Sequence, residues 1–308
     1  MKKTKELTVQ ELRKQKRRKR QMKQKLATML ALVLVLTVGM LGTMAYLSTV
    51  SDKKENVFTG SKGIELTLTE PNWDGDTDGD GIRDKDTDND GNYDPIGKTD
   101  AENYTPGITI AKDPMLQNTT DITKNTEKPS EWVALKVSYK LKKVTNTNPL
   151  TFDGEYSAIT YAEMKDIISA ISFHTGTAAD KWTEVEAGDD KTYGIYIYNS
   201  ALAADTDSDT KTKGGKTTAL FDNISVLNAS QLDSNFVDSG KTHIYGCKTN
   251  GSLPEFKIEV IGAAIQNDYD VTTLADLASK DAIDQTNYNG QKADVEVKNT
   301  LTTILKAN

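Results

Sequence analysis

Two short acidic repeats between Asp74 and Asp94 carry the clearest chemical signal of this sequence. Each repeat places carboxylates at its first, third and fifth positions, a glycine at the sixth and another aspartate at the ninth. Carboxylates with this spacing converge on one hard cation, the glycine permits a sharp turn, and the seventh residue offers its backbone carbonyl. The predicted Ca²⁺ ligands are Asp76, Asp78, Asp80, Ile82 and Asp84 in the first repeat and Asp86, Asp88, Asp90, Asn92 and Asp94 in the second.

The spacing matches an EF-hand only in part. Position 12 is Thr87 or Gly97 instead of a bidentate glutamate, and Pro71 and Pro95 bracket the loop, so flanking helices are not expected. The tandem resembles the calcium repeats of thrombospondin type 3 modules, in which neighbouring loops share carboxylates. We therefore predict an acidic calcium-binding insertion over residues 74–100, with an affinity of roughly 10⁻⁴–10⁻³ M. The alternative is a solvated acidic linker that binds cations only weakly.

The N-terminal region has the composition of an export signal. Residues 1–25 carry twelve Lys or Arg and two Glu, and residues 26–44 form an apolar run. A basic region, an apolar region and small residues at a cleavage step are typical of a signal peptide. We predict a signal peptide over residues 1–45, cleaved near Ala45. The alternative is a retained membrane anchor, although the 19-residue apolar run is at the lower end of what spans a bilayer.

The charge distribution argues against a nucleic-acid partner. The whole chain has a formal net charge of −7, and its basic residues are concentrated in the leader, so the remainder is strongly acidic. We therefore predict no nucleic-acid binding, and membrane contact only through the leader before cleavage. The single cysteine, Cys247, cannot form an internal disulfide, and its expected state is a partly buried free thiol.

Alternating apolar residues predict several short β-strands. These cover residues 64–68, 108–110, 132–141, 193–198 and 256–266, and a late short strand is expected at 295–297. Helical spacing of apolar residues is limited to 161–173, with a second short helix expected at 274–283. Because short strands and polar loops dominate, we predict a mainly β fold. It is a jelly-roll-like β-sandwich over residues 46–308 with one or two short helices, preceded by an N-terminal signal or transmembrane helix.

Several stretches resemble the TasA/camelysin group of exported proteins of Gram-positive bacteria. At the start of the mature chain they are Ala45-Tyr46, Ser51-Asp52, Asn56-Val57-Phe58-Thr59-Gly60, the alternation of Ile64, Leu66 and Leu68, and the Leu-Thr-Glu-Pro-x-Trp-Asp run at 68–74. Later blocks at 106–118, 132–139, 220–226 and 256–266 follow the order found in the group. One departure is Leu47, where the group usually has an aromatic residue.

The resemblance implies a function outside the cell. It implies processing by a SipW-type signal peptidase and a location at the cell surface or in the biofilm matrix of a Gram-positive bacterium. It also implies a structural subunit that self-associates into fibres, in which the N-terminal segment, residues 46–59, completes the sheet of the next copy. The alternative is a monomeric, calcium-stabilised surface adhesin or binding module with polar ligand loops near 142–156, 200–218 and 285–292.

Camelysin gives its name to a metallopeptidase family, so peptidase activity is a further alternative. The chain has two histidines, His174 and His243, and no His-Glu-x-x-His run that would hold zinc on one helical face. His174 is expected to end a helix, and His243 to face solvent. There is no Gly-x-Ser-x-Gly motif, and the run at 214–217 lacks the first glycine of a phosphate loop. We therefore predict a protein that is not an enzyme, with a peptidase as the least favoured alternative.

Overall fold

The structure is a computed structural model of the 308-residue chain. It describes residues 56–58, 64–76, 97–102, 104–120, 129–147, 150–204, 214–236 and 253–307. The predicted signal peptide lies outside these ranges. Within them, no helix combines the length and the apolar character needed to cross a membrane.

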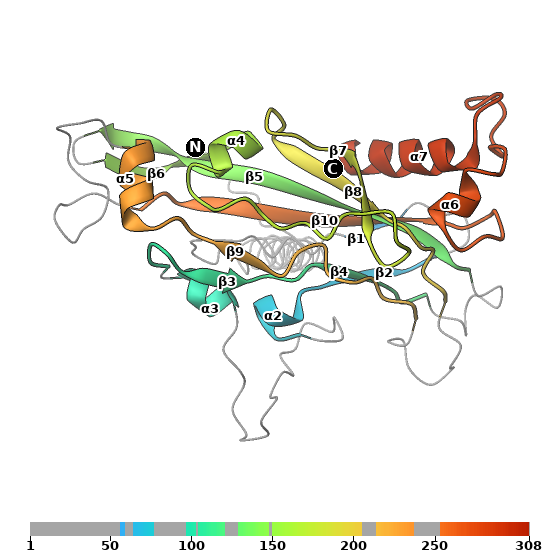
Figure 1. The fold of residues 1–308 in the computed structure, drawn as a ribbon, viewed down its shortest axis with the longest axis horizontal. Helices are drawn as coiled ribbons and strands as arrows, with labels where there is room; N and C mark the ends of the chain where they lie inside the picture. Colours follow the sequence, from blue (N-terminus) through green and yellow to red (C-terminus); the bar gives the residue numbers. More distant parts are fainter. Residues whose placement is uncertain are drawn as a thin grey trace, which may run out of the picture. The chain divides into compact units, whose positions relative to one another are not determined.

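Six strands form the main sheet (Figure 1). Its order is β1–β10–β5–β8–β7, and β6 also pairs with β5. The strands are β1 (Asn56–Phe58), β5 (Glu131–Thr147), β6 (Leu150–Ala158), β7 (Trp182–Glu186), β8 (Tyr193–Tyr198) and β10 (Phe256–Gln266). β10 pairs antiparallel with β5 along its entire length, from Phe256 opposite Leu141 to Gln266 opposite Glu131. β1 adds to the far side of β10 in the parallel direction.

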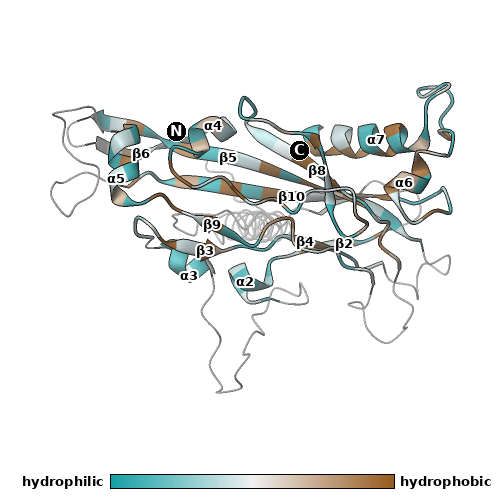
Figure 2. Cartoon of the chain, in the orientation of Figure 1, coloured by the Kyte–Doolittle hydropathy of each residue, from teal (hydrophilic) through white to brown (hydrophobic). Residues whose placement is uncertain are grey.

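A second layer of short strands packs against one face of this sheet (Figure 1). It consists of two antiparallel pairs, β2 (Leu66–Thr69) with β4 (Met115–Asn118) and β3 (Thr109–Ala111) with β9 (Asn223–Ser225). Phe256, Ile258, Val260 and Ala264 of β10 belong to this core. Hydrophobic and hydrophilic residues alternate along much of the strand (Figure 2). The layers approach closely at Gly262, where an added Cβ would lie 2.5 Å from Leu116 Cδ2.

Helix α7 (Ala293–Ala307) and the one-turn helix α6 (Leu274–Leu277) pack on the opposite face. The buried side of α7 repeats every four residues, with Ala293, Val297, Leu301 and Leu305 turned toward the sheet. These residues form a second core with Trp132, Ala134, Ile195, Ile197, Ile261 and Ala263 of the main sheet. The remaining described helices are α2 (Pro71–Asp74), α3 (Gly97–Glu102), α4 (Tyr161–Met164) and α5 (Ala229–Phe236).

The mainly β composition is confirmed, and so are most of the predicted strands. The predicted strand at 193–198 coincides with β8, and that at 256–266 coincides with β10. The prediction for 132–141 lies inside the longer β5, and the polar stretch 142–156, expected as a ligand loop, belongs largely to the β5–β6 hairpin. This hairpin extends the sheet beyond Phe256, the first residue of β10.

Three predictions that concern helical segments of the structure are wrong. The late strand at 295–297 is part of α7, because that segment has a sheet face to cover. The helix expected at 161–173 ends at Met164, since Ile168 bridges to Val226 and the Ser169 N–H donates to the Ser225 carbonyl. The described residues also contain more helices than the one or two short ones predicted.

Candidate functional site

The acidic insertion emerges between two short helices. Of the predicted calcium ligands, only Asp76 belongs to the described residues; Asp78, Asp80, Ile82, Asp84, Asp86, Asp88, Asp90, Asn92 and Asp94 lie outside them. Asp76 is 3% exposed, and its N–H donates to Asp74 Oδ1 over 3.1 Å. Among the described residues, no group of three or more His, Cys, Asp or Glu side chains is arranged to hold a metal. Calcium binding therefore stays a prediction.

The expectation that no helices flank the insertion is wrong. α2 ends at Asp74, just before the acidic repeats, and α3 begins at Gly97, just after them. Pro71 starts α2, at the first helical position, where its missing N–H and fixed φ are favourable. Both helices have only one or two turns, so they differ from the longer helices of an EF-hand. The ends of the insertion are thus held by ordered structure.

Two contacts fix these helices to the second layer. The Asn72 N–H of α2 donates to Asp113 Oδ1 over 2.8 Å, at the end of β3. Gly97 of α3 lies so close to the same strand that an added Cβ would be 1.8 Å from the Ala111 carbonyl oxygen and 3.1 Å from the Trp73 ring. Only glycine permits this approach, because the obstructing atom belongs to the backbone. Trp73 of α2 and Gly97 of α3, which flank the insertion in the sequence, therefore lie close together.

A buried ion pair lies next to α2. Lys112 Nζ is 2.7 Å from Glu70 Oε1 and 2.8 Å from Glu70 Oε2, and the two side chains are 0% and 6% exposed. The same ammonium group lies 4.8 Å from the centroid of the buried Trp73 ring, within cation–π range. Because both charges are removed from water, each depends on the other for compensation. The pair connects the residue before α2 with the end of β3.

Of the two histidines, His174 belongs to the described residues. His174 does not end a helix, as predicted, but lies in an irregular segment ten residues after α4. Its Nδ1 is 3.0 Å from the Ala219 carbonyl oxygen, and its Nε2 is 3.2 Å from Asp222 Oδ2. These contacts attach the segment to the chain that leads into β9. His243 and Cys247 lie outside the described residues.

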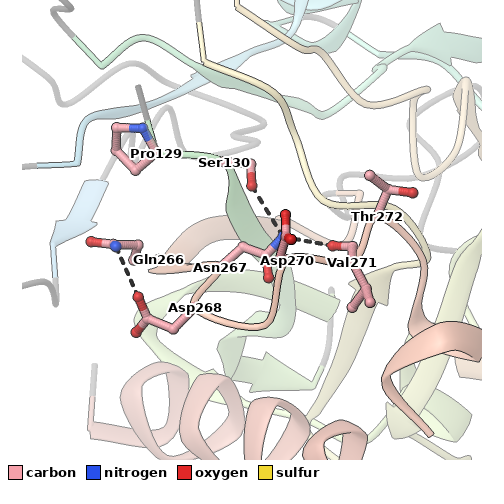
Figure 3. Close-up of a pocket in the computed structure, with 8 residues that line it drawn as sticks. All are labelled: Pro129, Ser130, Gln266, Asn267, Asp268, Asp270, Val271 and Thr272. Carbon is pink, nitrogen blue, oxygen red and sulfur yellow. Dashed lines mark hydrogen bonds between the residues drawn. The ribbon is translucent and has the colours of Figure 1, made fainter. Parts of the chain in front are cut away.

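A polar pocket of about 310 Å³ opens where β10 ends (Figure 3). Asn267 organises one wall, since its Nδ2 donates to Ser130 Oγ over 3.0 Å and to the Val271 carbonyl over 2.6 Å. Its Oδ1 accepts from Trp132 Nε1 over 3.0 Å. Asp268 and Asp270 contribute carboxylates, so the lining is acidic and hydrogen-bonding. The pocket lies outside the three ligand loops expected from the sequence.

Glu131 is a buried acid that the sequence pattern did not single out. It stands at the start of β5 with 0% exposure, and its Oε1 accepts from Thr120 Oγ1 over 2.7 Å. Its Oε2 has no hydrogen-bond partner among the described residues. Burial raises the pKa of Glu131 to about 8; the Thr120 hydrogen bond opposes this shift and the charge of Glu65 adds to it. The carboxyl therefore keeps its proton at neutral pH.

Comparisons with protein-family models, with curated proteins and with solved structures found nothing that matches this chain.

Replacing Lys112 tests the buried ion pair. Lys112→Met should lower the free energy of unfolding by about 3–5 kcal/mol, because Glu70 keeps a buried charge after losing this partner. Adding Glu70→Gln should recover part of the loss. Denaturant unfolding monitored by tryptophan fluorescence would measure both, with the exposed Lys280→Met as a control expected to change stability by less than about 0.5 kcal/mol. A neutral Lys112→Met would contradict the assignment.

Glu131 should make stability depend on pH. Below about pH 4.5 the carboxyl is protonated in both states, whereas between pH 4.5 and 8 the unfolded chain has lost a proton that the folded chain keeps. Stability contributed by this group therefore falls as pH rises through that window. Relative to the parent, Glu131→Gln should gain roughly 3–5 kcal/mol of unfolding free energy between pH 4.5 and 8.

Urea unfolding at several pH values would measure this gain. The matched control is Glu155→Gln, which makes the same chemical change at an exposed position of β6. It should follow the parent at every pH. A constant difference between Glu131→Gln and the parent across the window would show that Glu131 does not retain its proton.

Proposed function

We propose that this chain is an exported structural protein of the surface or biofilm matrix of a Gram-positive bacterium, and that its mature form assembles into fibres. One observation carries the proposal. Residues just after the predicted cleavage step reach the edge of the main sheet as β1, with Asn56 opposite Gly262 and Phe58 opposite Ala264. Residues 56–58, a part of the segment that the resemblance implicates in assembly, thus form a strand at a sheet edge.

The physical basis of assembly is backbone hydrogen bonding at a sheet edge. An edge strand presents unpaired N–H and C=O groups that another extended segment can satisfy. β1 has only three residues, so few backbone hydrogen bonds hold it to its own chain. If the N-terminal segment of each copy pairs with the next copy, the contact is head-to-tail and generates an open filament. Cleavage by a SipW-type signal peptidase would free the segment from the membrane.

Calcium has a stabilising part in this proposal. The carboxylates of residues 76–94 repel one another without a cation, and Ca²⁺ would draw them into a compact loop. The ordered base described above supports this reading, because α2 and α3 hold the two ends of the insertion. The bound ion would neutralise the charge of the carboxylates and link them to one another. It has no catalytic role in this proposal.

A jelly-roll-like β-sandwich is also part of the proposal. Sheets on both sides of one core, with mostly antiparallel pairing, are compatible with a jelly-roll-like sandwich. The parallel pairing of β1 with β10 is the exception, as expected if that position accepts an added strand.

A monomeric surface binding module is the second candidate, and the polar pocket at the end of β10 favours it. Its acidic and amide-rich lining suits a small polar or cationic ligand. The pocket and the sheet edge are separate features, so the two functions make different predictions about association.

Electron microscopy of residues 46–308 tests the fibre. An N-terminal tag would be removed by a protease in calcium and, in parallel, in chelator. We expect filaments only after tag removal, because a blocked N-terminus cannot enter another copy, and more filaments in calcium. A variant lacking residues 46–59 should remain monomeric. Filaments formed equally well by this variant, or monodisperse particles in both buffers after tag removal, would reject the fibre and favour the binding module.

A further inference from the structure

A buried polar cluster joins the start of β5 to the second layer. It consists of Asn118 at the end of β4, Thr120 two residues later, and Glu131, the first residue of β5. We call these three residues the Glu131 cluster. Their exposed fractions are 0%, 1% and 0%, so they are shielded from bulk water and each polar atom depends on a partner within the fold.

Thr120 connects the two layers through its hydroxyl group. Its Oγ1 donates to Glu131 Oε1 over 2.7 Å and accepts from the Glu65 N–H over 2.9 Å. A backbone bond lies beside this contact, since the Thr119 N–H donates to the Glu65 carbonyl over 2.9 Å. One hydroxyl therefore links the residue before β2 with the first residue of β5.

Asn118 fixes the other side of the cluster. Its Oδ1 accepts from the Thr120 N–H over 3.0 Å. Its Nδ2 donates to the Pro129 carbonyl over 3.1 Å and to the Leu202 carbonyl over 3.2 Å. Leu202 in turn exchanges two backbone hydrogen bonds with Glu131, of 2.8 and 2.9 Å. The amide of Asn118 is therefore satisfied on both its nitrogen and its oxygen.

Glu131 is less well satisfied than Asn118. Its Oε2 has no hydrogen-bond partner within the described ranges, and no cationic side chain there offsets a charge on it. Glu65 contributes a second negative charge, which opposes ionisation. Desolvation costs much more for a carboxylate than for a neutral carboxyl group. The closed cluster therefore requires a protonated Glu131, in agreement with its raised pKa.

We infer that the Glu131 cluster is a pH-sensitive switch: when Glu131 loses its proton, the contact between the start of β5 and the residues beside β2 and β4 opens and admits water. A carboxylate at this position gains hydration by leaving Thr120, which also holds Glu65. Its departure therefore weakens the bonds on both sides of the cluster. α7 packs on the opposite face of the sheet, so we expect the opening to stay local. The inference goes beyond the proposed function and holds whether or not fibres form.

Hydrogen exchange of single amides tests the switch on the full chain, purified in mild detergent. The Glu65 and Thr120 amides are the reporters, because each donates to a side chain of the cluster. After correction for the intrinsic effect of pH on exchange, their protection should fall about 10-fold per pH unit between about pH 5 and 7.5. Over this range the open state has lost a proton that the closed state keeps. Mass spectrometry with electron-transfer fragmentation resolves both amides.

Glu131→Gln keeps the shape of the side chain and cannot ionise. In this variant the protection of both reporters should change by less than about 2-fold over the same pH range. The matched control is Glu155→Gln, which makes the same change at an exposed position of β6 and should behave like the parent.

Urea separates local opening from global unfolding. Exchange of the two reporters should depend little on low concentrations of urea, whereas amides within α7 should exchange through global unfolding and depend on urea strongly. The switch is rejected if protection in the parent does not change with pH, or if it falls equally in Glu131→Gln. Reporters with the same urea dependence as α7 would also reject it, because only unfolding of the whole domain would then open the cluster.

Discussion

The antiparallel pairing of β10 with β5 is the constraint on which the rest of the structure depends. It places the two strands side by side over the eleven residues of β10 and aligns their alternating side chains. Val133, Leu135, Val137 and Tyr139 of β5 face the core shared with the short strands, whereas Trp132 and Ala134 face α7. A shift of one residue would exchange the two faces, so the register is fixed from both sides.

This central pair also organises the features that bear on function. Its outer edge receives β1, residues 56–58. The short strands packed on one face carry α2 and α3, which flank the acidic insertion in the sequence, and the buried Lys112–Glu70 pair. β1 and the two helices beside the insertion therefore belong to different parts of the fold, one to an edge of the main sheet and the others to the second layer.

Strands with strong alternation could be predicted from the sequence, and α7 could not. Tyr193–Tyr198 is rich in aromatic and β-branched residues, and apolar residues alternate in the first half of Phe256–Gln266, so both favour a strand. In α7, by contrast, Val295, Val297 and several threonines give a local preference for strand. The helix forms because Leu301 and Leu305, one turn apart, cover the face of the sheet that would otherwise be exposed. Tertiary packing decides this segment.

In the candidate site, too, some features could be predicted from local sequence and others depend on tertiary packing. The spacing of the aspartates is a local signal and could be found in the sequence, as could the resemblance that points to export. The Lys112–Glu70 ion pair joins residues 42 positions apart, and the buried Glu131 bonds through its backbone to Leu202. No local pattern encodes such contacts. From residue type alone, Lys112 and Glu131 would be predicted to lie on the surface, because charged side chains are seldom fully buried.

Amide hydrogen exchange along β10 is the most direct measurement of whether β1 belongs to this sheet. Residues 46–308 would be compared with a chain that begins at residue 60. Because β1 pairs with Gly262, Ala263 and Ala264, its removal should speed exchange in that part of β10 and leave β8, which lies between β5 and β7, unchanged. Identical exchange of β10 in the two chains would contradict the place of β1 at the sheet edge and the role in assembly proposed for it.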